Sequence, residues 1–289
     1  MHYQGNIFRP PSEAYSILLQ VTTGCSHNKC TFCGMYKGSR FAIKDDTTIM
    51  ADIDFAALHC KAQDRLFLCD GDALILPQER LLAILTAIRQ KLPWVTRIGT
   101  YANTKSIRRK TPEQLRELRE NGLAIAYMGL ESGDDVTLAS INKGADSTRM
   151  IEMGQKIRAT GIKLSVTVLL GIAGRDRSLI HARETGRVLT AIDPEYVGAL
   201  SLMLTPNTPL FEAERRNDFI LPSPSQMLEE LAVMFAATGL TNGYFHANHA
   251  SNYLPIKARL PKDREATLQL IDRALKGQVS LKPEYLRGL

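Results

Sequence analysis

Three of the chain's five cysteines lie within the stretch GCSHNKCTFCG at positions 24–34. Cys25, Cys30 and Cys33 have the spacing Cys-x4-Cys-x2-Cys. Closely spaced thiolates are the ligands that iron–sulfur clusters and zinc ions take from proteins. A [4Fe–4S] cluster normally has four thiolate ligands, so a loop that supplies three leaves one iron open to a small molecule. A structural zinc ion needs a fourth ligand, such as His27, and the spacing alone leaves both alternatives open.

The other two cysteines, Cys60 and Cys69, are isolated in the sequence, and we expect Cys69 to be a small buried residue. An odd number of cysteines behind a polar N-terminus favours reduced thiols over a disulfide framework, so we expect a cytoplasmic protein. No segment approaches the roughly 18 apolar residues of a membrane helix, and we expect no membrane partner. The net charge of +6 is spread along the chain, which favours an ordinary solvated surface over a nucleic-acid site.

Short apolar stretches alternate with longer segments of helical period, the pattern of repeated βα units around a parallel sheet. The six candidate strands are residues 16–22, 65–69, 95–100, 123–129, 163–170 and 196–204. Six units predict an α/β fold, either a partial (β/α)6 TIM-like barrel or an open doubly wound sheet. The cysteine loop follows the first strand, so it lies at the carboxyl end of that strand, where βα folds build their active sites.

Helix signals separate these strands. Thr111 with Gln114, and Ser223 with Gln226, predict capping boxes with proline at the first helical position. The pattern changes near residue 241, where a turn-rich, aromatic segment precedes an amphipathic helix. We therefore predict an N-terminal segment (1–15), a barrel (16–240) and a C-terminal extension (241–289) packed on the barrel.

The cysteine loop resembles the cluster-binding loop of the radical S-adenosylmethionine (SAM) superfamily. Members usually carry Cys-x3-Cys-x2-Cys with an aromatic residue before the last cysteine, a position that Phe32 occupies in this chain. One extra residue is present among positions 26–29, for which we expect a local bulge. The resemblance implies a partial barrel, a [4Fe–4S] cluster on Cys25, Cys30 and Cys33, and SAM bound at the open iron.

Further segments at strand ends resemble the superfamily branch that contains the Elongator catalytic subunit and oxygen-independent coproporphyrinogen oxidase. They are CDGDAL at 69–74, GLESG at 129–133 and SVTVLLG at 165–171, and RATGIKL at 158–164 resembles the branch's basic helix end. The resemblance implies that the SAM contacts come from Phe32, Asp70, Gly71, Asp72, Glu131, Ser132, Arg158 and Gly171. The residue types suit this, because glycine admits a close ligand and carboxylates accept hydrogen bonds from an ammonium group.

The resemblance implies an enzyme that cleaves SAM reductively to a 5′-deoxyadenosyl radical, which abstracts a hydrogen atom from an unidentified small-molecule substrate. It also implies an electron donor such as flavodoxin or ferredoxin, whereas the catalytic residues stay unknown. With only Cys60 and Cys69 left over, we expect no conventional auxiliary cluster. Two alternatives stay open: radical SAM modification of RNA or protein, and a noncatalytic zinc or iron–sulfur redox protein.

The segment FHANHASNY at 245–253 concentrates hydrogen-bonding side chains. We expect substrate specificity to reside there, because the cluster and SAM occupy the six barrel units. For His246 and His249, a role in loop packing or capping is favoured over metal ligation.

Overall fold

A computed structural model describes residues 1–288 of the chain. The chain divides into two compact units, each with its own strands and helices. The first unit contains Met1–Asn28, Met35–Met128 and Lys156–Leu164, and the second contains Lys29–Gly34, Gly129–Gln155 and Ser165–Leu289. Cys25 therefore belongs to the first unit, whereas Cys30 and Cys33 belong to the second.

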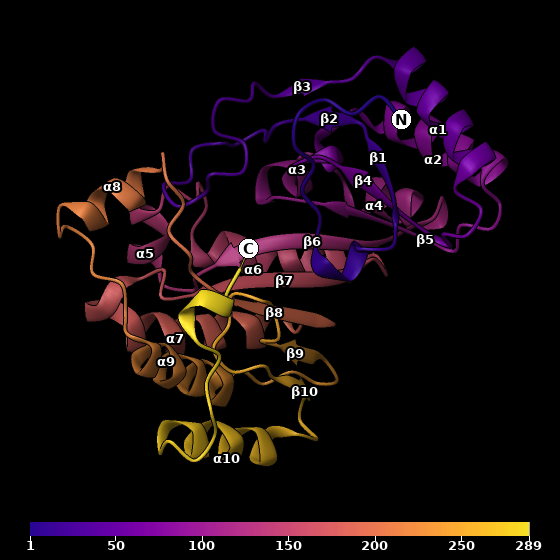
Figure 1. Cartoon of the computed structure of the whole chain (residues 1–289). Helices are drawn as coiled ribbons and strands as arrows, with labels where there is room; N and C mark the ends of the chain where they lie inside the picture. Colours follow the sequence, from indigo (N-terminus) through magenta and orange to yellow (C-terminus); the bar gives the residue numbers. More distant parts are fainter. Residues whose placement is uncertain (289) are drawn as a thin grey trace. The chain divides into compact units, whose positions relative to one another are not determined.

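Four parallel strands form the sheet of the first unit. They are β1 (Ile17–Gln20), β4 (Arg65–Cys69), β5 (Arg97–Tyr101) and β6 (Leu123–Glu131), adjacent in that order (Figure 1). The last four residues of β4 are all buried, as expected of a parallel strand covered on both faces. Two short strands, β2 (Thr22–Thr23) and β3 (Ala42–Ile43), pair antiparallel in a separate sheet.

Helices connect the strands of the first unit, as βα units require. α1 (Asp46–His59) precedes β4, α2 (Gln78–Lys91) joins β4 to β5, and α3 (Thr104–Arg108) and α4 (Pro112–Glu120) join β5 to β6. At the start of α4, Thr111 and Gln114 each accept a hydrogen bond from the other's backbone amide, which confirms the predicted capping box. Short 3-10 helices occupy Pro11–Glu13 and Ala73–Ile75.

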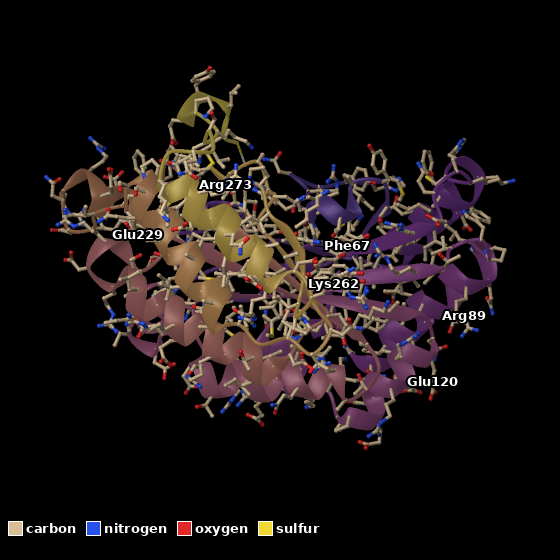
Figure 2. All side chains as sticks on the ribbon, turned by 90° about the horizontal axis from the view of Figure 1, so that it is seen from below. Phe67, Arg89, Glu120, Glu229, Lys262 and Arg273 are labelled. Atoms are coloured by element: carbon tan, nitrogen blue, oxygen red, sulfur yellow. The ribbon has the colours of Figure 1, made fainter. Side chains whose placement is uncertain are left out.

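The interior of the first unit is aromatic. Phe67 on β4 is fully buried, and its ring centroid lies 5.0 Å from that of Tyr101 and 5.8 Å from that of Tyr127, both edge-on. Figure 2 shows Phe67 among the strands, whereas Arg89 and Glu120 lie on helices at the outside. The Arg89 side chain donates to the Glu120 carbonyl at 3.2 Å and so ties α2 to α4.

The second unit carries three parallel strands and one antiparallel strand (Figure 1). β7 (Lys163–Leu170), β8 (Tyr196–Ser201) and β9 (Tyr244–His246) are adjacent and parallel, and β10 (Lys257–Arg259) pairs antiparallel with β9. The C-terminal extension therefore begins by adding strands beside β8.

Helices pack in layers in the second unit. α7 (Gly174–Ile192) packs against α9 (Pro224–Ala237), and α9 packs against α10 (Arg264–Leu275). The predicted capping box of Ser223 and Gln226 is confirmed at the start of α9. The remaining elements are α5 (Asp135–Ser140), α6 (Ser147–Arg158), α8 (Pro209–Arg215) and a 3-10 helix at Glu284–Leu286.

All six predicted strands are present, as β1, β4, β5, β6, β7 and β8, and the α/β class is confirmed. The sequence does not predict β9 and β10, because strands of three residues are too short to show a hydrophobic period. The boundaries 1–15, 16–240 and 241–289 stay predictions. Within residues 1–288, no helix combines the length and apolar character needed to cross a membrane.

Candidate functional site

The cysteine loop after β1 approaches the turn after β4 in the first unit. Gly71 lies at the centre of the Asp70–Asp72 turn and has no room for a side chain, because an added Cβ would lie 3.0 Å from Cys25 Cβ and 2.9 Å from Tyr36 Cε2. Cys25 itself is half-buried and is not part of a disulfide. Glycine at position 71 thus permits Cys25 to lie against the turn for which we predict SAM contacts.

Asp70 is committed to partners within the protein. Its Oδ1 accepts a hydrogen bond from the Tyr36 hydroxyl at 3.0 Å, and its Oδ2 accepts one from Gln20 Nε2 at 2.9 Å. The Phe8 amide approaches Oδ1 at 3.4 Å. Both oxygens of Asp70 are therefore already used to hold the N-terminal segment, β1 and the loop around Tyr36 together.

Asp72 is fully buried and has one oxygen to spare. Oδ2 accepts from Ser26 Oγ at 2.5 Å and from Asn103 Nδ2 at 2.8 Å. No donor within residues 1–288 reaches Oδ1, although this atom is buried. Burial raises the pKa of Asp72, and hydrogen bonds from Ser26, Ser106 and Asn103 counteract part of that effect. Asp72 therefore presents an open acceptor that a cationic ligand would satisfy.

In the second unit, the backbone between Cys30 and Cys33 is fixed by two hydrogen bonds. The Thr31 amide donates to the Ile141 carbonyl, and the Leu210 amide donates to the Thr31 carbonyl, each at 3.0 Å. Phe32 packs on a buried apolar cluster, which consists of Ile141, Ile172, Leu202 and Leu210. Ile172 follows Gly171, so this packing brings the cysteine loop to the carboxyl end of β7.

The extra residue of the cysteine spacing falls in an irregular stretch. Asn28 has a φ of +43°, and its side chain donates to the Tyr36 carbonyl at 2.9 Å. Within residues 1–288, no three His, Cys, Asp or Glu side chains are grouped as ligands of one metal ion. Ligation of one cluster by Cys25, Cys30 and Cys33 therefore stays a prediction that rests on the spacing.

Glu131 ends β6 in the left-handed region, with a φ of +63°. Its Oε1 accepts from Lys143 Nζ at 2.9 Å, and the two side chains are only 10% and 15% exposed. No hydrogen bond within residues 1–288 uses Oε2. The carboxylate is thus held by one oxygen and keeps the other for a ligand.

A buried polar network joins the ends of β6 and β7 to α7 and α9. Ser132 Oγ lies 2.7 Å from His181 Nδ1, and His181 Nε2 lies 3.3 Å from Glu230 Oε1. Glu230 Oε1 also accepts from the Gly171 amide at 2.7 Å, and its Oε2 accepts from Ser178 Oγ. Ser132, His181 and Glu230 are all fully buried. This network holds the Ser132 side chain and the Gly171 amide in place, so both groups have a structural role.

Replacing Glu230 by alanine is expected to lower the free energy of unfolding by roughly 3 kcal/mol, because the Gly171 amide and the Ser178 hydroxyl would lose their acceptor while buried. Urea unfolding followed by circular dichroism measures the change. Glu229, the exposed neighbour on α9 labelled in Figure 2, is the matched control, and its alanine variant should stay within about 0.5 kcal/mol of wild type. Equal stability of the two variants would contradict the network's importance.

Comparison with known protein families identifies the family of this chain. The model of the radical SAM superfamily matches residues 19–182, which is more than half of the chain. The chain belongs to the radical SAM superfamily. No curated protein matches the chain at a significant level.

Solved radical SAM proteins share the fold. The methyltransferase TsrM from Kitasatospora setae, solved with cobalamin and a [4Fe–4S] cluster, has a TM-score of 0.57 and 18% identity, over 74% of this chain and 43% of TsrM. Coproporphyrinogen III oxidase (HemN) from Escherichia coli has a TM-score of 0.56 and 16% identity, over 76% of this chain and 51% of HemN. Methylornithine synthase (PylB) has a TM-score of 0.55 and 16% identity, over 78% of this chain and 63% of PylB.

These likenesses show the partial-barrel fold and confirm the predicted fold class. The match to the family model confirms the predicted superfamily. The chain spans between about two fifths and two thirds of the length of these solved proteins. The superfamily is one of enzymes, and its cofactors are a [4Fe–4S] cluster and SAM. The buried, unpartnered Oδ1 of Asp72 fits such a cosubstrate, whose amino group is a hydrogen-bond donor.

Arg158 precedes strand β7 in the chain. It ends α6, before β7 begins at Lys163, so it stands at the amino end of that strand. The turn after Arg158 is held by Arg119 in the last turn of α4, whose side chain donates to the Gly161 carbonyl at 3.0 Å. The topology gives the Arg158 prediction no support, since ligand sites of βα folds lie at the opposite strand ends.

The side chains of the 245–253 segment serve the fold to a large extent. Asn252 Oδ1 accepts from Ser201 Oγ and its Nδ2 donates to the Ala199 carbonyl, each at 2.8 Å. Tyr253 donates to Glu284 at 2.6 Å, and His249 Nδ1 lies 2.9 Å from Ser251 Oγ. These contacts agree with the predicted packing role of His249, and a role in substrate specificity stays a prediction.

Several residues that hold the candidate site groups are not predicted from the sequence. Asn103 and Lys143 hold the two candidate carboxylates, and His181 with Glu230 holds the ends of β6 and β7. Asn103 follows the end of β5, and that position after a strand is a usable signal. Lys143 follows helix α5, and His181 lies on helix α7. Polar residues are common in such segments, so the neighbouring sequence does not mark these two as site residues.

Proposed function

We propose that this radical SAM protein is an enzyme that binds a [4Fe–4S] cluster through Cys25, Cys30 and Cys33 and acts on a small-molecule substrate. When bound, the reduced cluster supplies the electron that cleaves SAM to methionine and a 5′-deoxyadenosyl radical, which abstracts a hydrogen atom from the substrate. The unpartnered Oδ1 of Asp72 carries the proposal. A buried carboxylate oxygen without a donor is costly, and a ligand's ammonium group would satisfy it.

The protein's groups position SAM in this proposal. Asp72 Oδ1 accepts from the amino group, and Glu131 Oε2 accepts from a ribose hydroxyl. Gly71 keeps the backbone of the turn accessible. Phe32 and the segment ending at Gly171 supply the apolar surroundings of the adenine, because both belong to the packed region around Ile172.

An external electron donor such as flavodoxin or ferredoxin is part of the proposal, and so is a cytoplasmic location, where the ligand thiols stay reduced. Modification of RNA or protein is not favoured by the fold or the site. A noncatalytic zinc or redox protein is not favoured either, because the superfamily is one of enzymes.

Anaerobic reconstitution with iron and sulfide tests the proposal. The wild-type chain is expected to bind about four irons. With dithionite and SAM, it should form 5′-deoxyadenosine, measured by liquid chromatography and mass spectrometry. Protein treated identically without sulfide is the control. A fully loaded cluster that cleaves no SAM would refute the enzyme proposal, and about one zinc without iron would support the noncatalytic alternative instead.

A further inference from the structure

Lys143 is held in place by the end of helix α5. Asn142 has a φ of +56°, its amide donates to the Ala139 carbonyl, and the Lys143 amide donates to the Leu138 carbonyl, each at 3.0 Å. This is the Schellman pattern that ends helices, with asparagine in the left-handed position. The residue after that position is commonly apolar and packs back on the helix. In this chain the residue is Lys143. Its backbone is fixed by the helix end, and its side chain is charged instead of apolar.

The same helix end contacts the cysteine loop of the second unit. The Thr31 amide, between Cys30 and Cys33, donates to the carbonyl of Ile141 at 3.0 Å. Lys143 is two residues further along the chain. The loop is therefore hydrogen-bonded to the chain two residues before Lys143, and both segments lie within the second unit.

The Lys143 ammonium group faces negative groups in a largely buried setting. It lies 2.9 Å from Glu131 Oε1, and its side chain is 15% exposed. The charges of Glu131, Cys30 and Cys33 act on this ammonium group. The ion pair with Glu131 therefore holds a lysine cation near the cysteine loop, whose backbone is tied to the same helix end by the hydrogen bond between Thr31 and Ile141.

A fixed cation beside thiolate ligands changes the reduction potential of the cluster that they hold. Reduction adds a negative charge to the cluster, and net charge and polar neighbours of the sulfurs set the potential of iron–sulfur centres. A cation nearby stabilises the reduced state more than the oxidised state, and burial preserves the effect because solvent screens it less.

We propose that Lys143 is a positioning residue with a redox role: its ammonium group beside Cys30 and Cys33 favours the reduced cluster, and its ion pair with Glu131 orients that carboxylate. The inference rests on the proposed function, because it requires the cluster. The electron itself comes from the external donor protein, and Lys143 changes only the equilibrium of that one-electron transfer.

Redox titration of the anaerobically reconstituted full chain, followed by electron paramagnetic resonance without SAM, tests this role. Lys143→Gln is expected to lower the ratio of reduced to oxidised cluster about tenfold at a given solution potential, a shift of about 59 mV to more negative values. Lys143→Arg keeps the charge and should restore most of the wild-type potential. Lys262→Gln removes the same charge from the exposed position labelled in Figure 2 and should leave the potential unchanged.

Glu131→Gln gives an independent measurement, because removal of the negative partner should shift the potential in the positive direction. If Lys143→Gln does not retain iron, the Glu131→Gln shift decides the matter, and an unchanged potential overturns the inference. Unchanged potentials in iron-loaded variants likewise overturn the inference while leaving the proposed function intact. A wild-type chain that assembles no cluster would instead refute the proposed function.

Discussion

Replacing Cys30 by alanine is expected to remove the iron–sulfur cluster, lowering the iron content after reconstitution from about four atoms per chain to less than one. Three cysteines are the minimum in this loop for a cluster with one open iron, so loss of any one leaves two irons without a protein ligand. Formation of 5′-deoxyadenosine should fall below detection. Iron and sulfide analysis with the visible absorption spectrum measures the result.

The isolated thiol of Cys60 provides the control for this experiment. Cys60 caps the end of α1, far along the chain from the cysteine loop, and it is not part of a disulfide. Its alanine variant should bind the wild-type amount of iron. A Cys30→Ala protein with a full iron content and an unchanged spectrum would contradict the assignment of the three ligands.

Replacing Asp72 by asparagine is expected to weaken SAM binding about 10- to 100-fold, the equivalent of one charge-assisted hydrogen bond of about 1.5–3 kcal/mol. The amide can keep an oxygen towards Ser26 and Asn103, which occupy Oδ2 in the wild type. The other atom then becomes a donor in place of the open Oδ1 acceptor, so it repels an ammonium group. Equilibrium binding of SAM to the reconstituted protein measures the loss.

Asp70 is the matched control, because it lies two residues away and both of its oxygens have protein partners. Asp70→Asn disturbs the contacts with Gln20 and Tyr36 and should lower stability, with a much smaller effect on SAM affinity than Asp72→Asn. If Asp70→Asn weakens SAM binding as much as Asp72→Asn does, the assignment of the ligand carboxylate to Asp72 is wrong.

The pKa of Asp72 also predicts how the Asp72→Asn substitution changes the free energy of unfolding. Burial raises this pKa, so the folded chain binds the proton more tightly than the unfolded chain does. The contribution of Asp72 to the free energy of unfolding therefore grows as the pH falls through the folded-state pKa, and it is least favourable above that pKa. Asp72→Asn, which is neutral at every pH, should unfold at an equal or higher urea concentration than wild type at pH 7. A stability loss together with weaker SAM binding would mean that the variant disrupts the turn.

The main elements of the fold were predictable because their signals are local. The stretch 65–69 coincides with β4, since a parallel strand buried on both faces appears in the sequence as an apolar run. The stretch 163–170 coincides with β7, whose residues after the first alternate between buried and half-buried, as the period of a strand requires. The capping boxes at Thr111 and Ser223 involve residues three apart, so the local sequence is sufficient to predict their hydrogen bonds. The cysteine loop and the Asp70–Asp72 turn were located in the same way, from their places directly after strands.

By itself, the sequence determined the superfamily, the parallel strands and the loops that carry the chemistry, because each depends on residues close together in the chain. Only the tertiary structure decided that Asp70 is used by the fold while Asp72 has an open oxygen, since their partners lie far away in sequence. It also decided that Lys143 faces Glu131, and that Glu230 holds the Gly171 amide across 59 residues. Such contacts depend on how strands and helices pack, and packing brings together side chains that no short stretch of sequence contains.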